Sequence, residues 1–399
     1  MHQKFYRKVL KNGMTILFEK RDLPVVSVAF SVRYGGINES SEERGIAHFI
    51  EHLLYKGTKN RTYQQISSEI EKNGGVLNGF TDETLTAFWC KMPSDKLKIA
   101  LDVLGDMVRN PLFDEKEMDK ERKIIFEEMK LYHDSPMHYV FDKIQQFLYK
   151  EPLGISLIGT EKTLNSVTRK KMADKCDEIY GPGNLVLSVV GDADFKDIVK
   201  YVEKNFGGGK GKIKKQKIVS KNGSGIEKRK GIDQANLVLA FHSPLSTDKK
   251  SYASRVLMNL MANGLSSRLF HEIREKRNMA YSIFGDVSCN RNFSYSYVYA
   301  GVLKENVEKV KNLILKEFEK VSKELSEKEL QQSKEQLLGN HKISMESSDS
   351  RMVQLLGFEV DGNAKNFYSF EKNIRAVKLK DVKELAKIKK YSFFALVPE

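Results

Sequence analysis

The sequence has few of the residues that would build a disulfide scaffold or cross a membrane. Among its 399 residues are 3 cysteines, and Cys90, Cys176 and Cys289 stand far apart without paired spacing. We therefore expect reduced thiols in apolar or helical surroundings. No stretch approaches 18 apolar residues, and no apolar signal region follows Met1. These absences predict no membrane span and a cytoplasmic location.

Acidic residues are in the minority. The chain has 67 Lys and Arg residues against 53 Asp and Glu residues, a formal net charge of +14. Such a charge could attract nucleic acid or an anionic surface. Many of the lysines lie within residues 206–233, however, and no nucleic-acid-reading motif is visible. We expect a solvated, lysine-rich surface and no nucleic-acid partner.

Histidine is also scarce, yet two of the 8 histidines lie four residues apart in the segment HFIEH at 48–52. That spacing places His48 and His52 on one helical face, about a turn apart, with Glu51 beside them. The neighbouring residues supply an apolar stripe that predicts packing against a core: Ile46, Phe49, Ile50, Leu53 and Leu54. Burying two imidazoles and a carboxylate without partners is costly, and one metal ion would satisfy all three groups. The segment therefore predicts a metal site in which His48 and His52 are ligands and Glu51 is a base.

A catalytic zinc site needs a third protein ligand and one open position. Residues 115–132, EKEMDKERKIIFEEMKLY, have helical periodicity, and Glu121 and Glu128 lie two turns apart on one of its faces. The segment carries three further glutamates: Glu115, Glu117 and Glu127. The residues alone therefore favour Glu128 as the third ligand only slightly over a solvated acidic helix.

The length and an internal repeat predict two domains. A chain of 399 residues is long for one core. Residues 69–82 can be aligned with 272–286, and residues 113–128 with 325–340. In the second alignment Asn340 answers to Glu128, so only the first copy is expected to hold zinc.

Between the two copies, residues 206–233 are rich in Gly, Lys and Ser and lack apolar periodicity, which predicts a linker. We expect a zinc-bearing domain at 1–205 and a homologous domain without zinc ligands at 234–399. Short strands alternate with helices in both. The predicted class is α+β, with each repeat a mixed or largely antiparallel sheet that has helices on one face.

Three segments together resemble the pitrilysin/insulinase superfamily of zinc peptidases, in the short form related to mitochondrial processing peptidase. They are GIAHFIEHLLYKGTKNRT at 45–62, GGVLNGFTDETLTAFW at 74–89 and ERKIIFEEMKLYHDSP at 121–136. In that family the third ligand follows the second His by about 76 residues, which implies Glu128. A supporting Glu seven residues earlier implies Glu121. The resemblance therefore implies one Zn²⁺ per chain, held by His48, His52 and Glu128.

A further segment, GLSSRLFHEIREKRNMAYSIFG at 264–285, resembles the second domain of the same family. Its paired Arg and Tyr imply that Arg274 orients the peptide and that Tyr281 stabilises the developing oxyanion. Residues 263–265 stand where many relatives carry a longer glycine-rich loop, so gating of the cavity can differ. The family pattern implies that two chains close around one chamber, as a homodimer or as a heterodimer with a paralogue.

The implied activity is that of a zinc metalloendopeptidase acting on peptides or unfolded polypeptide segments. Glu51 would take a proton from water and return it to the leaving amine. The resemblance also implies that substrate adds as an edge strand at 77–88, with Asn78 and Gly79 near the scissile bond. Ligand type favours Zn²⁺ over Mn²⁺ or Co²⁺. The alternatives are a non-catalytic subunit of the same fold and a basic module that binds peptide or nucleic acid.

Overall fold

The computed structural model describes residues 4–209, 211, 213–214 and 216–399. The chain forms two compact units. The first consists of residues 1–129, 155–217 and 344–367, and the second of residues 130–154, 218–343 and 368–399. The sequence predicted that the chain divides once, at 206–233. Each unit instead also includes a segment from the other half of the sequence.

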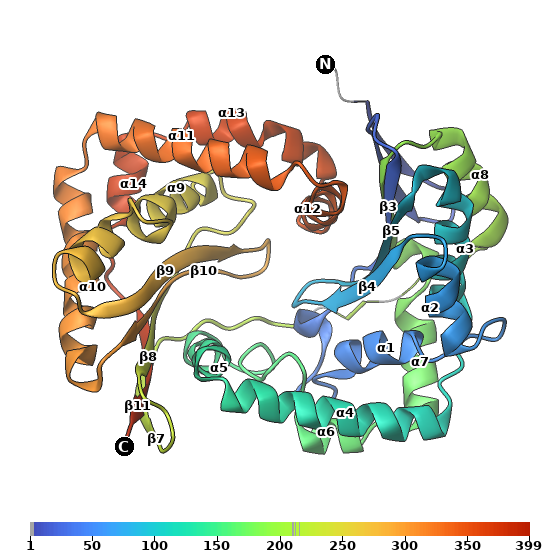
Figure 1. The fold of residues 1–399 in the computed structure, drawn as a ribbon, viewed down its shortest axis with the longest axis horizontal. Coiled ribbons are helices and arrows are strands. Elements are labelled where there is room, and N and C mark those ends of the chain that lie inside the picture. Colours follow the sequence, from blue (N-terminus) through green and yellow to red (C-terminus); the bar gives the residue numbers. More distant parts are fainter. Residues whose placement is uncertain (1–3, 210, 212, 215) are drawn as a thin grey trace. The chain divides into compact units, whose positions relative to one another are not determined.

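The first unit is built on a six-stranded sheet in the order β1-β2-β6-β3-β5-β4 (Figure 1). The strands are β1 (Phe5–Val9), β2 (Thr15–Lys20), β3 (Val25–Val32), β4 (Val76–Thr81), β5 (Thr86–Pro93) and β6 (Leu185–Gly191). All neighbours pair antiparallel except β2 and β6, which are parallel. Strand β4 lies at one edge of the sheet as described, where it pairs with β5.

One face of this sheet is covered by helices from the first half of the chain (Figure 1). The longer ones are α1 (Ile46–Leu54), α2 (Tyr63–Glu71), α3 (Leu97–Arg109), α7 (Arg169–Ile179) and α8 (Phe195–Asn205). Alternation along the inner strands sends every second residue into this core, as Val28 and Phe30 of β3 show. Helix α4 (Glu115–Asp134) adds the buried side chains of Met118 and Ile125. The helix-covered sheet is the arrangement that the sequence predicted.

The opposite face of the first sheet is covered by α12 (Ser348–Val360), which comes from the second half of the chain. Met352, Leu355 and Leu356 of α12 are buried against sheet residues that include Ala29 and Val186. The α+β class and the repeat are confirmed, and α12 extends the expected picture by placing a helix on the second face as well.

Ion pairs with little exposure to water fix α12 to this sheet. Arg351 donates to both carboxylate oxygens of Glu19 on β2, at 2.6 and 2.9 Å. Glu359 accepts from Arg7 of β1 at 2.8 Å and from Arg33 at 2.9 Å. The Glu19 and Glu359 side chains are almost fully buried. The position of α12 therefore depends on charge pairing as well as on apolar contact.

The second unit contains a five-stranded sheet in the order β7-β11-β8-β10-β9. The strands are β7 (Ser224–Arg229), β8 (Ala235–His242), β9 (Ala280–Cys289), β10 (Ser294–Val302) and β11 (Ser392–Pro398). Only β7 and β11 pair in parallel. This order and its single parallel pair reproduce the arrangement of β2-β6-β3-β5-β4, which confirms the repeat.

Part of the expected linker belongs to this second sheet. Residues 224–229 form strand β7, so the connecting segment is shorter than the predicted 206–233. Residues 210, 212 and 215 of the predicted linker lie outside the described residues.

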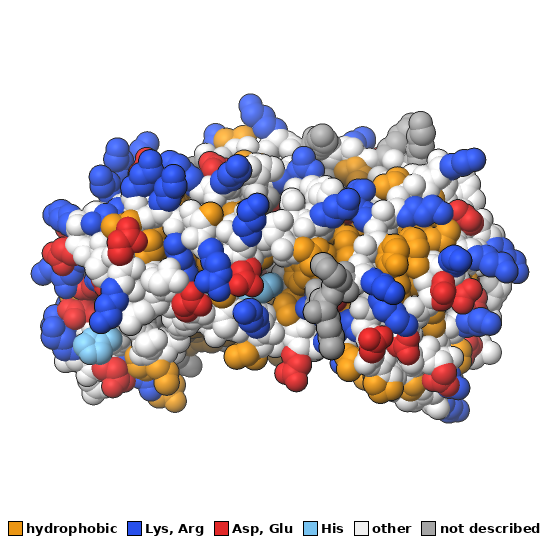
Figure 2. All heavy atoms as spheres, turned by 90° about the horizontal axis from the view of Figure 1, so that it is seen from above, with side chains coloured by type: hydrophobic (Ala, Val, Ile, Leu, Met, Phe, Trp, Pro, Cys, Tyr) orange, Lys and Arg blue, Asp and Glu red, His pale blue; other side chains and the backbone are white. Residues whose placement is uncertain are grey.

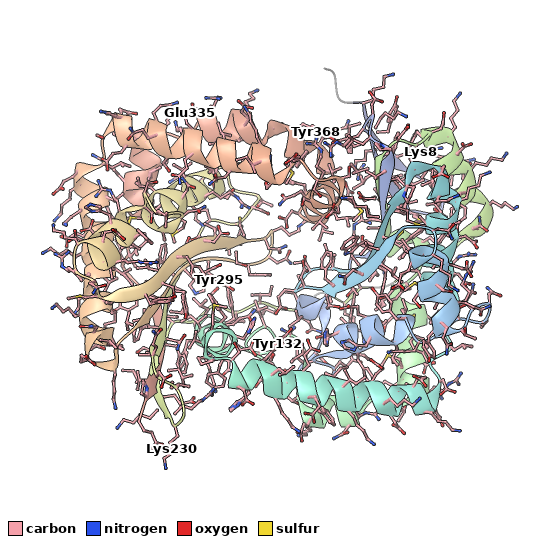
Figure 3. All side chains as sticks on the ribbon, in the orientation of Figure 1. Lys8, Tyr132, Lys230, Tyr295, Glu335 and Tyr368 are labelled. Atoms are coloured by element: carbon pink, nitrogen blue, oxygen red, sulfur yellow. The ribbon has the colours of Figure 1, made fainter. Side chains whose placement is uncertain are left out.

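The helices of the second unit correspond in order to those of the first. They are α9 (Ser251–Ala262), the π-helical turn η4 (Phe270–Glu275), α10 (Val307–Glu324), α11 (Glu327–Ser344), α13 (Phe370–Arg375) and α14 (Leu379–Leu385). Helix α5 (Pro136–Leu148), from the first half of the chain, packs on β8 and β11. Tyr149, directly after α5, has its ring centre 6.2 Å from that of Tyr295 on β10. Tyr295 is labelled in Figure 3. Helices α5 and α12 are therefore exchanged between the two repeats.

The short α6 (Glu161–Asn165) completes the helices of the first unit. Within the described part of the chain, no helix is both long and apolar enough to span a membrane.

Candidate metal centre

The start of helix α1 is fixed by a buried cluster of charges. The helix follows Gly45, whose φ of 94° suits glycine, and a Cβ there would lie 2.6 Å from the carbonyl oxygen of Ile158. The Glu39 carboxylate accepts from the backbone N–H groups of Gly45 and Ala47 at 3.0 and 2.7 Å. It thereby satisfies N–H groups at the start of the helix. Arg44, fully buried, lies 3.6 Å from Glu39 and donates to Glu83 at 2.6 Å.

Helices α1 and α4 bring three potential metal ligands together. Nε2 of His48 lies 3.7 Å from Oε2 of Glu128, and Nε2 of His52 lies 3.6 Å from the same oxygen. The ring centres of His48 and His52 are 4.6 Å apart. Among the described residues, this trio is the group of His, Cys, Asp or Glu side chains close enough to hold one metal ion, with ligand atoms within 4.8 Å of one another.

These distances fit a shared ion better than direct hydrogen bonds. Separations of 3.6 and 3.7 Å exceed the usual hydrogen-bond range. Two nitrogen or oxygen ligands at about 2.0–2.1 Å from a tetrahedral zinc lie roughly 3.3 Å apart. Small side-chain adjustments would bring His48, His52 and Glu128 to that spacing. Two imidazoles and one carboxylate are the protein ligands of some catalytic zinc sites.

The two imidazoles lie in different electrostatic surroundings. Burial lowers the pKa of His48 to about 4, so its imidazole is neutral at pH 7 and able to ligate. Burial also acts to lower the pKa of His52, but the hydrogen bond with Glu121 and the nearby carboxylates of Glu128 and Glu51 raise it to about 9. A cation binding at His52 must therefore displace a proton at neutral pH. Nδ1 of His48 is buried and has no hydrogen-bond partner within the described residues, so packing holds this ring.

Glu121 stands behind His52, where the family resemblance placed a supporting glutamate. Its Oε2 lies 3.1 Å from Nδ1 of His52, and its Oε1 accepts from Nζ of Lys56 at 2.8 Å. The Glu121 side chain is buried. The contact of Lys56 with Glu121 was not predicted from the sequence. The one available signal was that Lys56 lies four residues, about one helical turn, after His52.

Glu51 lies between strand β4, to which it is hydrogen-bonded, and the charges of His52 and Glu128. Its Oε2 accepts from the hydroxyl of Thr81 at 2.8 Å, and burial raises the pKa of its carboxyl group. A Cβ added at Gly79 would lie 3.3 Å from Oε1 of Glu51 and 2.4 Å from the hydroxyl of Tyr55. The structure thus brings the predicted base next to the predicted substrate strand. The roles of Thr81 and Tyr55 were not recognised from the sequence.

Asn78 and Gly79 lie on β4, opposite Trp89 and Phe88 of β5. Oδ1 of Asn78 accepts from the backbone N–H of Gly79 at 2.8 Å. Both residues are therefore on the edge strand where substrate addition was predicted, and their contact with substrate stays a prediction.

Arg274 and Tyr281 belong to the second unit, on η4 and β9 respectively. The guanidinium carbon of Arg274 lies 5.8 Å from the ring centre of Tyr281 and 4.9 Å from that of Phe270. Tyr281 is 74% exposed, so its hydroxyl is not committed to a core. The structure brings the two side chains together, and their part in a reaction stays a prediction.

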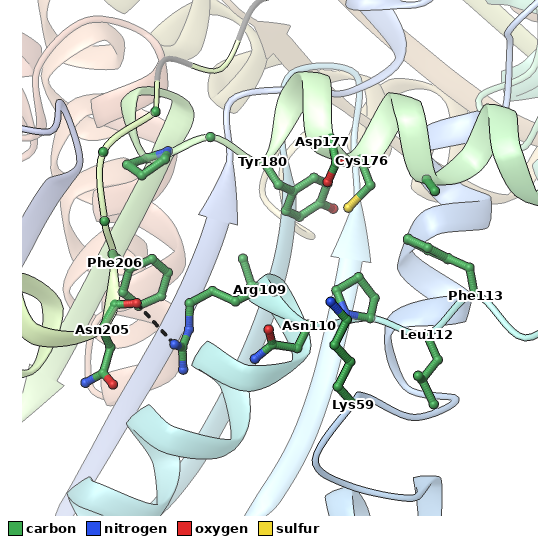
Figure 4. Close-up of a pocket in the computed structure, with 18 of the residues that line it drawn as sticks. Lys59, Arg109, Asn110, Leu112, Phe113, Cys176, Asp177, Tyr180, Asn205 and Phe206 are labelled. Carbon is green, nitrogen blue, oxygen red and sulfur yellow. Dashed lines mark hydrogen bonds between the residues drawn. The ribbon is translucent and has the colours of Figure 1, made fainter.

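A separate pocket in the first unit does not involve these residues. It has a volume of about 590 Å³ and lies where α3, α7 and α8 end (Figure 4). Its arginines donate to backbone carbonyls: Arg109 to Asn205 at 3.1 Å, and Arg169 to Phe113 at 2.9 Å. None of the predicted site residues lines it.

The surface charge shows no single basic patch on the face that Figure 2 presents. Lys and Arg side chains are spread across that face, with Asp and Glu side chains among them. This distribution agrees with the solvated lysine-rich surface expected from the composition.

Comparison with known proteins gives the same relationship over most of the chain. Residues 15–161 match the family described as Insulinase (Peptidase family M16), and residues 166–337 match the Peptidase M16 inactive domain. A Rickettsia felis protein named "Uncharacterized zinc protease" is 31% identical over 94% of this chain and 90% of its own length. "Uncharacterized zinc protease YmxG" of Bacillus subtilis is also 31% identical, over 87% of this chain and 86% of its own.

Solved structures share the fold. A protease from Helicobacter pylori superposes with a TM-score of 0.88 at 22% identity, over 99% of this chain and 100% of that one. A peptidase M16 inactive domain from Pseudomonas fluorescens superposes with a TM-score of 0.89 at 19% identity, over 100% and 99%. The resemblance drawn from the sequence motifs is thus confirmed: the chain belongs to the insulinase family of zinc peptidases, peptidase family M16.

Proposed function

We propose that this chain is a zinc metallopeptidase that hydrolyses peptides or unfolded polypeptide segments. The observation that carries the proposal is the approach of two imidazole Nε2 atoms to one oxygen of Glu128, with Glu51 on the same helix turned toward an edge strand. Relatives named as zinc proteases support the same assignment.

His48, His52 and Glu128 would hold one Zn²⁺ per chain. Bound zinc would supply Lewis-acid chemistry, which acidifies water and polarises a peptide carbonyl. The neutral imidazole of His48 suits this task because its burial disfavours the protonated form. Glu121 fixes the tautomer of His52 by accepting from Nδ1, which leaves Nε2 free to face the metal.

Glu51 would act as general base and then as general acid. Its carboxylate takes the proton from the attacking water and later delivers it to the leaving amine. Burial raises the pKa of Glu51, which makes it a stronger base than an exposed glutamate. Its position next to Gly79 places the proton-transferring oxygen beside the proposed substrate strand.

We infer that substrate binds as an additional strand along β4. One edge of β4 pairs with β5, which leaves its other edge for a peptide backbone. Backbone pairing is tolerant of sequence, so we expect broad use of unstructured peptides. Asn78 and Gly79 would lie nearest to the scissile bond.

Arg274 and Tyr281 would complete the site from the second unit of a partner copy. Arg274 would orient the peptide, and the exposed Tyr281 would donate to the developing oxyanion. This arrangement requires a homodimer, or a heterodimer in which a paralogue supplies the Arg and Tyr.

The test is zinc content together with cleavage of an unstructured peptide mixture, in the wild type and in Glu51→Gln. Glu127→Gln is the matched control, because Glu127 neighbours Glu128 on α4 but is exposed. We expect near-stoichiometric zinc in all three proteins and cleavage only in the wild type and the control. Absence of zinc from the wild type would contradict the proposal. Zinc without cleavage in the wild type would point to a missing partner chain.

A further inference from the structure

We propose that two residues outside the ligand set, Lys56 and Thr81, are positioning residues that control separate properties of the site. Lys56 acts through Glu121 on retention of the metal, and Thr81 acts through Glu51 on proton transfer. The proposal rests on the zinc-peptidase function proposed above and adds residues to it that no motif singled out.

Lys56 secures the carboxylate behind His52. Its Nζ lies 2.8 Å from Oε1 of Glu121, whose other oxygen is 3.1 Å from Nδ1 of His52. The Glu121 side chain is 4% exposed, so water cannot readily replace a lost partner. Without the ammonium group, a buried carboxylate would keep one of its two partners and could rotate away from the imidazole. Since the partners of ligating histidines typically contribute 10–100-fold to metal affinity, retention of the metal should weaken.

Thr81 holds one carboxylate oxygen of Glu51 and leaves the other beside Gly79 of the same strand. Its hydroxyl donates to Oε2 of Glu51 at 2.8 Å, while Oε1 lies on the Gly79 side. Thr81 ends β4 and is held in register opposite Thr86, and its β-branched side chain has few rotamers. The hydrogen bond therefore comes from a fixed point and directs the unbonded oxygen toward the proposed peptide.

The two contacts originate in different elements. Lys56 follows α1 and bonds to α4, whereas Thr81 lies on β4 and bonds to the middle of α1. Removal of one should leave the other in place. This separation predicts that metal affinity and turnover respond independently.

The second repeat provides an internal comparison. Thr86 of β5 and Ser296 of β10 occupy the same position relative to the 3-10 helix that follows each strand, Ser94–Lys96 or Lys304–Asn306. Their cross-strand partners are Thr81 and Val287. Strand register thus matches Thr81 with Val287, whereas the sequence alignment matches it with Gly285, and neither residue carries a hydroxyl. In sequence alignment Ser333 answers to Glu121, and its hydroxyl donates instead to the carbonyl of Val256.

The experiment compares Lys56→Met, Thr81→Val and Thr81→Ser with the wild type, using Lys123→Met on the exposed face of α4 as the control. Zinc dissociation constants are measured by competition with a chromogenic chelator. The values of kcat and KM are measured on an unstructured reporter peptide at saturating zinc. The infrared band of the Glu51 carboxyl group, identified from the wild type minus Glu51→Gln difference, reports on Thr81 without turnover.

We expect Lys56→Met to weaken zinc binding about 10–100-fold and to leave kcat of the loaded enzyme within about twofold. Thr81→Val should lower kcat about 10–100-fold, shift the Glu51 band, and leave KM and zinc affinity unchanged. Thr81→Ser should restore both kcat and the band. If Thr81→Val unfolds, Thr81→Ala replaces it.

Unchanged zinc affinity in Lys56→Met, or an unshifted Glu51 band in Thr81→Val, would overturn the proposal. Parallel loss of affinity and turnover in both variants would also overturn it, because that pattern indicates a merely structural role. Failure of the underlying function would look different: the wild type itself would bind no zinc.

Discussion

Nδ1 of His52 lies 3.1 Å from Oε2 of Glu121, on the opposite side of the imidazole from the Nε2 atom that faces Glu128. A carboxylate at this point accepts the Nδ1–H, so the lone pair of Nε2 is directed at the metal position. Glu121 would therefore orient His52 without itself being one of the three potential ligands.

Glu121→Gln should weaken zinc binding about tenfold, and Glu121→Ala up to about 100-fold. The amide keeps an oxygen that can accept from Nδ1 of His52 but loses the negative charge that favours ligation. Zinc titration against a competing chelator measures whether affinity falls from the wild type to Glu121→Gln and then to Glu121→Ala. Equal zinc affinity in the wild type and Glu121→Ala would show that Glu121 does not contribute to zinc binding.

Zinc should raise the unfolding temperature of the wild type and of Glu51→Gln, but not of His52→Ala or Glu128→Gln. Binding to the folded state alone stabilises it by about 2.7 kcal/mol at a free zinc concentration 100 times Kd. Thermal unfolding with and without chelator measures the difference. A zinc-dependent shift that persists in Glu128→Gln would place the ion elsewhere.

Gly79→Ala should impair cleavage, and Tyr55→Phe should relieve part of the loss. A Cβ at Gly79 would come within 2.4 Å of the Tyr55 hydroxyl and 2.9 Å of the Ala87 carbonyl oxygen. Tyr55→Phe removes the hydroxyl oxygen, which is the closer of these two atoms to the added Cβ. The test is a double-mutant cycle on kcat/KM, in which simple additivity of the two changes would contradict the predicted contact.

Arg351→Met should destabilise the protein by about 3–5 kcal/mol, because it leaves the buried Glu19 carboxylate without its guanidinium. The double variant Arg351→Met with Glu19→Leu should recover much of the loss, since neither charge then remains buried. Urea unfolding of the wild type, the single variant and the double variant checks the prediction. A double variant no more stable than Arg351→Met would show that packing, rather than the unpaired charge, causes the loss.

The stabilising contribution of Glu359 should disappear in acid. Burial would raise its pKa, but hydrogen bonds from Arg7 and the Ala364 N–H, together with the charges of Arg7 and Arg33, lower it below the ordinary 4.5. A lowered folded-state pKa means that the unfolded state takes up the proton first as pH falls. The contribution is therefore present above pH 4.5 and is lost as pH falls through the folded-state value. Glu359→Gln should be less stable than the wild type at pH 7, and the two curves should converge toward pH 3.

The sequence contained enough to predict that His48, His52 and Glu128 lie together and that the chain contains a repeat. Helical periodicity determined which side chains of α1 lie together, and family spacing selected Glu128 among five glutamates of one helix. The order of strands in the second sheet repeats that of the first, as the aligned segments indicated.

Other features depend on contacts that local patterns do not encode. The apolar stripe of α12, with Met352, Leu355 and Leu356, predicts a buried face but not which sheet it covers. Strand β7 has one large apolar residue, Ile226, and its partner β11 lies at the other end of the second repeat. The sequence of β7 was therefore interpreted as part of the linker. The Thr81 contact joins residues thirty positions apart and carries no periodic signal.

The exchange of α5 and α12 sets the order in which the protein can finish folding during synthesis. His48, His52 and Glu128 all emerge within the first third of the chain, but residues 344–367 of the unit that holds them are translated after most of the second repeat. Because translation proceeds at about 5–20 residues per second, α12 is synthesised many seconds after these three residues and only then can cover the first sheet. A nascent chain that stops before residue 344 contains His48, His52 and Glu128 but lacks α12, so the sheet face that α12 covers stays exposed to water, chaperones and proteases.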